Sequence, residues 1–239
     1  MKSSDASPTK PRGRPRGFDR DTALARATEV FWRQGYEGTS VADLTRAMRI
    51  NPPSLYAAFG DKQHLYLEAV ERYQQGRHDE LAPLLDEAPT ARQAIERLLR
   101  EAARLYAQRD APRGCMLALS GTTCAEASLQ SQLAKRRANA NKVFKARIER
   151  GLREGELPRG THAGALADFY ATVLRGMALQ ARDGVSRRSL GATVEAAMRA
   201  WPARHPSTVK TRSVMSSPRG TSSHRMRLSP ERHSSSDGD

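Results

Sequence analysis

The sequence predicts an all-α fold, and three observations predict it. Between residues 18 and 201, apolar side chains recur three or four positions apart, the spacing that gives a helix one buried face. Capping residues stand before several of these stretches, and glycines and prolines stand between them. Residues 1–17 are polar and end in Pro, Gly and Arg, while residues 202–239 are rich in Ser, Pro and Arg and lack aromatics. We expect both flanking segments to be disordered.

The composition narrows the classes of partner. The chain has 239 residues, and 40 Lys and Arg against 26 Asp and Glu give a formal charge of +14. Nucleic acid is the favoured partner because the basic excess is partly concentrated in the arms, although a basic protein without a particular partner remains the alternative. We expect no membrane partner, since no apolar run approaches the ~20 residues that cross a bilayer. Two cysteines and no secretory leader predict a cytoplasmic protein.

The N-terminal arm contains the run Arg12-Gly13-Arg14-Pro15. This run resembles the core of an AT-hook, an extended strip whose arginines lie along a narrow minor groove. The strongly negative potential of such grooves attracts Arg12 and Arg14. The alternative is a basic tail that adds only attraction to phosphates.

The first helix is expected over residues 18–34, with Asp19 as its N-cap and Gly35 at its end. Its apolar face should support two short helices that follow. The small core that these helices share should contain Phe31, Leu44, Leu55 and Phe59.

Gly38–Tyr73 predicts two short helices and one longer helix. Ser40 begins the first, with Asp43 in the place of the capping-box acid, and Asn51 and Pro52 begin the second. Helices shorter than about 12 residues are marginal alone, so these must pack on their neighbours. A short helix, a tight turn and a second short helix make the helix-turn-helix plan, whose second helix enters the major groove of DNA.

The segment resembles the DNA-binding domain of the TetR/AcrR family of bacterial transcriptional regulators, with a contiguous match from about Phe18 to Tyr73. The matching features are Gly35-Tyr36, Gly38-Thr39-Ser40, Pro53-Ser54-Leu55-Tyr56 and Phe59-Gly60-Asp61-Lys62. Arg49 departs from the pattern, because the family usually has Gly in this turn. A non-Gly residue with positive φ costs roughly 1 kcal/mol or more. Three interpretations stay open: another turn geometry, a strained turn, or an Arg49 side chain that reaches a phosphate.

The resemblance implies roles for individual residues. It turns Leu55 inward and places on the DNA-facing side Pro53, Ser54, Tyr56, Ala57 and Ala58. The Ser54 hydroxyl suits several bases, and either alanine suits a thymine methyl. Phosphate contacts are expected from Tyr56, from Thr39 or Ser40, and from Lys62. The alternatives are that Tyr56 is a half-buried core residue and that Lys62 is a solvated charge.

A connecting helix is predicted from Asp61 to about Arg77, and two prolines at positions 83 and 89 predict a break after it. The predicted domains are therefore a helix-turn-helix domain at 18–77 and a helical effector-binding and dimerisation domain at 78–201. His78, Asp79 and Glu80 are adjacent and point in different directions on a helix, so we expect no metal site, and we expect no cofactor.

The body should be helical throughout. A long helix is expected over residues 126–154, with inward residues Leu129, Leu133, Val143, Phe144 and Ile148. Its basic residues should form a solvated face: Lys135, Arg136, Arg137, Lys142, Lys145 and Arg147. The last two helices carry clean apolar stripes, and the resemblance implies that they pair with their mates in a homodimer. A core within one subunit would show the same spacing.

The body can also hold a small molecule between its helices. The candidate lining residues are Leu105, Tyr106, Cys115, Met116, Phe144, Phe169 and Tyr170. An alternative makes Cys115 or Cys124 a redox or electrophile sensor, which requires an exposed thiolate of lowered pKa.

The favoured function is a sequence-specific transcriptional regulator, expected to be a repressor, that binds a palindromic operator in double-stranded DNA and is released from it by an unknown small-molecule effector. A DNA-coating protein without sequence preference is the second class. An enzyme is not expected, because the sequence has no Gly-rich phosphate loop, no H-E-x-x-H motif and no nucleophile elbow.

Overall fold

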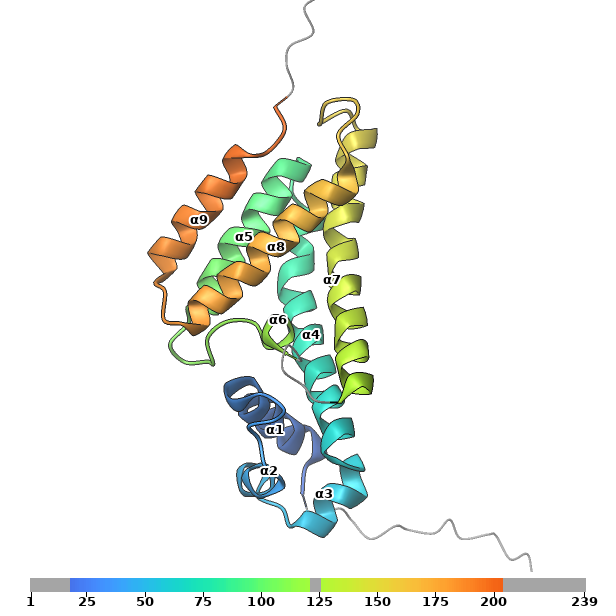
Figure 1. Cartoon of the computed structure of the whole chain (residues 1–239), viewed down its shortest axis with the longest axis vertical. Coiled ribbons are helices and arrows are strands. Elements are labelled where there is room, and N and C mark those ends of the chain that lie inside the picture. Colours follow the sequence, from blue (N-terminus) through green and yellow to red (C-terminus); the bar gives the residue numbers. More distant parts are fainter. Residues whose placement is uncertain (1–17, 121–125, 204–239) are drawn as a thin grey trace, which may run out of the picture. The chain divides into compact units, whose positions relative to one another are not determined.

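The computed structural model describes residues 18–120 and 126–203, and within these ranges every regular element is an α-helix (Figure 1). The predicted all-α fold is confirmed. The helices are α1 (Arg20–Gln34), α2 (Val41–Met48), α3 (Pro52–Phe59), α4 (Lys62–Asp86), α5 (Ala91–Tyr106), α6 (Met116–Leu119), α7 (Ala127–Arg153), α8 (Ala163–Arg182) and α9 (Arg187–Arg199). Arg12, Arg14 and Cys124 lie outside the described residues. Over the described ranges, no helix is both long enough and apolar enough to span a membrane.

The helix starts follow local capping chemistry as predicted. The Asp19 carboxylate accepts a hydrogen bond from the Thr22 N–H at 2.6 Å. The Ser40 hydroxyl accepts one from the Asp43 N–H at 3.1 Å, and the Asp43 carboxylate accepts the Ser40 N–H in return, which completes the capping box. The Asn51 side chain caps α3 in the same manner. Each cap pairs an N–H that the helix itself leaves open.

We call α1, α2, α3 and the first half of α4 the head. Its core contains the four predicted residues, and Phe31, Leu44, Leu55 and Phe59 are all buried. The Phe31 ring meets the ring of Tyr66 edge to face, with centroids 4.9 Å apart. The two short helices bury their apolar side chains against α1 and α4, which stabilises helices too short to form alone.

The predicted end of the connecting helix near Arg77 is wrong, since α4 continues to Asp86 with Pro83 inside it. Proline removes the hydrogen bond to the carbonyl four residues earlier and usually breaks a helix. Here Leu85 is buried in the core of the body and Leu81 packs against it, so tertiary packing offsets the lost bond. The Glu87 N–H then donates to the Pro83 carbonyl at 2.9 Å where the helix ends.

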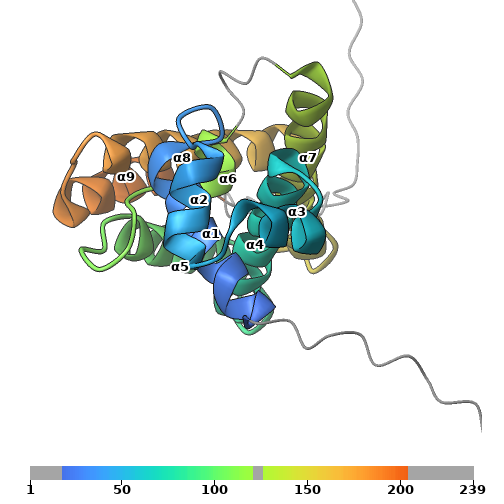
Figure 2. The ribbon, with the colours of Figure 1, turned by 90° about the horizontal axis from the view of Figure 1, so that it is seen from below.

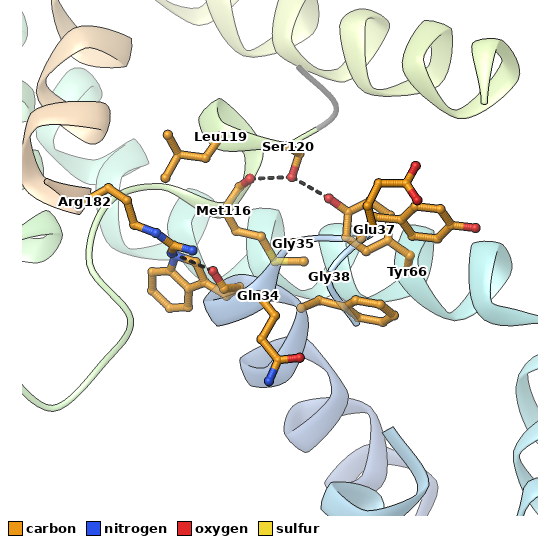
Figure 3. A pocket seen from close by; sticks show the side chains of 12 residues that line it. Gln34, Gly35, Glu37, Gly38, Tyr66, Met116, Leu119, Ser120 and Arg182 are labelled. Atoms are coloured by element: carbon orange, nitrogen blue, oxygen red, sulfur yellow. Dashed lines mark hydrogen bonds between the residues drawn. The ribbon is translucent and has the colours of Figure 1, made fainter. Parts of the chain in front are cut away.

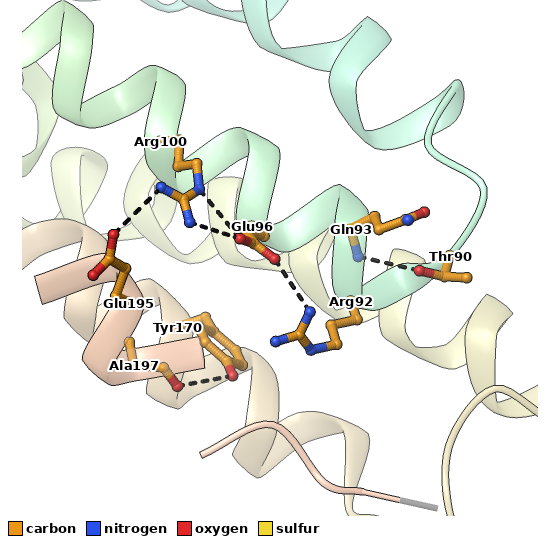
Figure 4. Close-up of polar contacts among 8 residues, drawn as sticks. All are labelled: Thr90, Arg92, Gln93, Glu96, Arg100, Tyr170, Glu195 and Ala197. Carbon is orange, nitrogen blue, oxygen red and sulfur yellow. Dashed lines mark hydrogen bonds and ion pairs between the residues drawn. The ribbon is translucent and has the colours of Figure 1, made fainter. Parts of the chain in front are cut away.

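We call α5 to α9 the body, whose apolar core lies between α5, α7, α8 and α9. Figure 4 shows the polar contacts at one edge. Arg100 contacts Glu96 at 2.8 Å on its own helix and Glu195 of α9 at 3.9 Å. Beneath them, the Tyr170 hydroxyl donates to the Ala197 carbonyl at 3.3 Å. These contacts join α5, α8 and α9 into one unit.

The basic face expected on α7 is partly wrong. Arg147 is only 4% exposed, and its guanidinium donates to the Leu85 carbonyl at 3.1 Å and to the Ala88 carbonyl at 3.2 Å. It therefore pairs one carbonyl in the last turn of α4 and one in the loop after the helix, and it does not face solvent. Arg137 also lies inward, because it donates to the Ser120 carbonyl at 2.7 Å.

Candidate nucleic-acid interface and cavity

Helix α3 has one buried side and one side that faces solvent. Leu55 and Phe59 are buried at 0% and 3% exposure, so they fix the orientation of the helix. The opposite side carries the predicted DNA-facing residues: Pro53, Tyr56 and Ala57 are exposed, and Ser54 and Ala58 are half-buried. Figure 2, seen from below, shows α3 beside α2 at this end of the head. Tyr56 is 49% exposed, so the alternative that it belongs to the core is wrong.

The turn between α2 and α3 contains Arg49 in the left-handed region, with φ 59° and ψ 45°. Arg49 is the sole non-glycine residue with positive φ in the described parts of the chain. The turn keeps the geometry that favours glycine, so the interpretation of another geometry is wrong and the strained turn is supported. The side chain is exposed, and its contact with a phosphate stays a prediction.

The other predicted phosphate contacts differ in their availability. Thr39 is 1% exposed, and its hydroxyl already donates to the Gly35 carbonyl at 2.6 Å, so its side chain has no donor left for a phosphate. Ser40 is exposed, but its hydroxyl donates to the Asp43 carboxylate at 2.6 Å. Lys62 is half-buried with its ammonium 4.2 Å from the centroid of the Tyr36 ring, rather than fully solvated.

Arg46 is a candidate that sequence analysis left out. Its side chain is 79% exposed in the last turn of α2, directly before the Arg49 turn, and it contacts Asp43 at 3.3 Å. Its basic charge beside the turn was the available signal. Exposed arginines in this position have the reach and the donors for phosphate oxygens.

A cavity of about 360 Å³ lies between α4, α5, α6, α7 and α8. Of the predicted lining residues, it brings together Tyr106, Cys115 and Phe144. Most of the remaining lining comes from α4, including Tyr73, Arg77 and His78, and continues beyond the point where the sequence predicted the helix to end.

The structure does not place the other four candidates in this cavity. Leu105 and Tyr170 are buried in the body core, and Met116 is buried in the head core. Phe169 is 41% exposed, its ring meets the Tyr170 ring edge to face, and it does not line this cavity. Val143 is predicted to lie inward, but it is 42% exposed, although it contributes to the lining of the cavity.

A second cavity, of about 330 Å³, lies where the head meets the body (Figure 3). The Tyr66 hydroxyl donates to the Ser120 hydroxyl at 2.7 Å, and Ser120 donates to the Met116 carbonyl. On the other side, Arg182 at the end of α8 donates to the Trp32 carbonyl at 2.8 Å and to the Arg33 carbonyl. These two carbonyls belong to the last turn of α1, where a helix leaves acceptors open.

Helix α6 contacts both cavities. Leu117 lines the first cavity, Met116 lines the second, and both are buried in the head core. The loop before α6 lies tightly against α8, because a Cβ on Gly114 would stand 2.6 Å from the Ala178 carbonyl oxygen. Helix α6 and the loop before it therefore connect the first cavity to the head core, through Leu117, and to α8 of the body, through Gly114.

Comparison with known proteins shows which family has this architecture. Residues 23–69 match the model of the bacterial regulatory proteins of the tetR family. The HTH-type transcriptional repressor ComR of Escherichia coli (strain K12) is 32% identical over 198 residues, 81% of this chain and 93% of that protein. The repressor BdcR of the same organism is 34% identical over 182 residues, 76% of this chain and 88% of that protein.

A solved structure agrees over a similar length. A cysteine mutant of the TetR family transcriptional regulator CifR, complexed with 26 bp double-strand operator DNA, is 46% identical with a TM-score of 0.77. The match covers 80% of this chain and 100% of that chain. Both repressors and this solved structure match the chain over most or all of their own lengths. The chain therefore belongs to the TetR family of bacterial transcriptional regulators.

Proposed function

We propose that the chain is a sequence-specific transcriptional repressor that binds a palindromic operator as a homodimer and is released by a small molecule. The observation that carries this proposal is the solvent-facing side of α3, where Tyr56 and Ala57 are exposed while the buried Leu55 fixes the orientation of the helix. Hydroxyl and methyl groups on such a helix suit base edges and phosphates in a major groove. The repressor names of ComR and BdcR and the operator complex of CifR support it.

The surface of α8 supports the homodimer. Phe169 and Leu179 are exposed at 41% and 53%, and Gly176 on the same helix is exposed, with open space beside its Cα. Exposed apolar side chains next to small residues suit close packing of a second helix. A two-fold axis then places two copies of α3 on half-sites one or more helical turns apart.

The cavity between α4 and α7 is the proposed effector site. Its volume of about 360 Å³ lies within the usual range for ligand pockets, and Tyr106, Cys115 and Phe144 line it. An effector that fits the cavity better in one orientation of α4 and α6 shifts the population away from the DNA-binding state.

A cysteine-based response is the second candidate, because Cys115 is a half-buried free cysteine on the wall of this cavity. A reactive small molecule that enters the cavity reaches its thiol. Replacing Cys115 with Ser should then abolish release of DNA by oxidants or electrophiles. An unchanged response would remove Cys115 from this role.

The test of the main proposal is a binding selection with the full chain against random duplex DNA at near-physiological salt, followed by sequencing of the bound fraction. Enrichment of a palindromic site is the expected result. Binding without an enriched sequence, which disappears as salt rises, would instead support the DNA-coating function.

A further inference from the structure

The walls of the proposed effector cavity carry no unbalanced formal charge within the described chain. Glu71 forms an ion pair with Arg136 of α7, and Arg77 forms one with Glu80 at 2.5 Å. The apolar part of the lining is larger and consists of Leu81, Ala82, Leu85, Leu98, Leu117, Ala140, Val143, Phe144 and Leu174. A charged ligand would lose its hydration here without gaining an opposite charge, which is costly. The walls thus favour an uncharged ligand.

Several polar residues line the cavity, and three of them, Tyr73, Tyr106 and Cys115, lie close together at one end, where Tyr73 has an unpaired donor. Tyr73 is only 7% exposed, and its hydroxyl has no hydrogen-bond partner among the described residues. Cys115 and Tyr106 line the same cavity. A buried hydroxyl without a partner is destabilising, and native proteins rarely leave one without a water or a ligand to pair it.

The hydroxyl groups at this end stay protonated. Burial raises the pKa of Tyr73 and that of Tyr106 well above the usual value of a tyrosine, with a smaller contribution from the neighbouring Cys115 thiol. Both hydroxyls therefore remain neutral at physiological pH, so Tyr73 offers a hydrogen to an acceptor and no negative charge to a cation.

We propose that the effector is an uncharged, mainly apolar small molecule with one acceptor oxygen, such as a carbonyl, which accepts a hydrogen bond from the Tyr73 hydroxyl. The inference rests on the proposed function of this cavity as the effector site. The apolar body of the ligand lies against Phe144 and the leucines, and its oxygen lies at the end formed by Tyr73, Tyr106 and Cys115.

The position of Tyr73 gives this hydrogen bond a regulatory meaning. Tyr73 is part of the head core, its ring meets the Trp32 ring of α1 at 4.9 Å, and it also lines the cavity. Cys115 packs against both the head core and the body core. The ligand oxygen thus contacts the residues that the cavity and the head share, whereas the apolar end contacts the body.

Four probes of similar size and different chemistry test the ligand class: acetophenone, ethylbenzene, phenylacetate and phenethylamine. Binding to the full chain is measured by calorimetry without DNA, for the wild type and for Tyr73→Phe. The matched control is Tyr170→Phe, which removes a buried hydroxyl outside the cavity. Thermal unfolding verifies that each variant is folded.

The wild type should bind acetophenone more tightly than ethylbenzene and should bind the two charged probes most weakly. Tyr73→Phe should weaken acetophenone binding about three- to tenfold, the loss expected for one hydrogen bond, and leave ethylbenzene unchanged. Tyr170→Phe should change neither. Tyr73→Phe should be at least as stable as the wild type, because it removes an unpaired buried hydroxyl.

Three results would overturn the inference: no binding of acetophenone, tighter binding of a charged probe, or an acetophenone preference that survives Tyr73→Phe. The DNA selection separates this failure from that of the proposed function. A chain that enriches a palindromic site but fails the probe test loses only the ligand class, whereas a chain without sequence preference for DNA is not the proposed repressor.

Discussion

Replacing Arg49 with Gly should stabilise the protein. Arg49 has φ 59° and ψ 45°, and a side chain in this conformation costs about 1–2 kcal/mol. Glycine removes that cost, but its greater freedom in the unfolded chain returns about 0.5–1 kcal/mol. The net gain in the free energy of unfolding is therefore about 0.5–1 kcal/mol. In a chain of this size, this corresponds to a rise in Tm of roughly 1–4 °C.

The assay is chemical and thermal unfolding of the wild type, Arg49→Gly and Arg49→Ala. Alanine removes the same charge but keeps the cost of the left-handed conformation, so it separates strain from electrostatics. Because the Arg49 side chain is exposed, Arg49→Ala should lie within a few tenths of a kcal/mol of the wild type. If Arg49→Gly is no more stable than Arg49→Ala, the turn stores no strain and the reasoning from its φ angle is refuted.

The same variants test the phosphate contact of Arg49. Each phosphate contact that is lost lowers the slope of log affinity against log salt by about 0.9, so a dimer that loses two should show a slope reduced by about 1.8. Both variants should show this change equally, because both lack the guanidinium. An unchanged slope with improved stability in Arg49→Gly would mean that the arginine strains the turn without contacting DNA.

The remaining predictions concern the buried Arg147, the exposed side of α3 and the N-cap of α4. Arg147→Ala should lower the free energy of unfolding by about 2–4 kcal/mol in urea, because two buried carbonyls lose their donors, whereas the exposed Lys145→Ala should change it by less than about 0.5 kcal/mol. Tyr56→Phe should weaken operator binding by about 1 kcal/mol without altering the sequence enriched in the selection, and a changed sequence would show base readout instead. The hydrogen bond from the His64 N–H lowers the pKa of the Asp61 carboxyl, so its stabilisation is complete at neutral pH and is lost as pH falls through the lowered pKa. Asp61→Asn should consequently flatten the acid side of the stability profile, and an identical profile would refute the assignment.

Local chemistry made the head predictable. Ser40 and Asp43 lie three residues apart, and Pro52 stands at a helix start, so each boundary depends on neighbours in the chain. The alternation of Leu55 and Phe59 with exposed positions likewise follows from the helical period.

The features that the sequence did not predict depend on contacts between residues far apart in the chain. Pro83 reads as a helix break until the burial of Leu85 in the body is known. Arg147 reads as a solvated charge because the carbonyls it pairs are about 60 positions away in the chain. The cavity lining was missed for a similar reason: apolar spacing indicates that Tyr170 is buried, but not whether its neighbour is a cavity or a helix.

Helix α4 runs from the head into the body as one continuous helix, so a tilt of α4 at the body moves the head. With 25 residues it is about 37 Å long, and one end packs against α3 while the other end packs in the body. A tilt of about 5° about its far end moves the near end by about 3 Å, close to the ~3.4 Å spacing of base pairs. A rotation of this size thus shifts α3 by about one base step. In the proposed homodimer, the two shifts would change the distance between the two copies of α3, so the proposed effector could act on DNA binding without contacting the DNA.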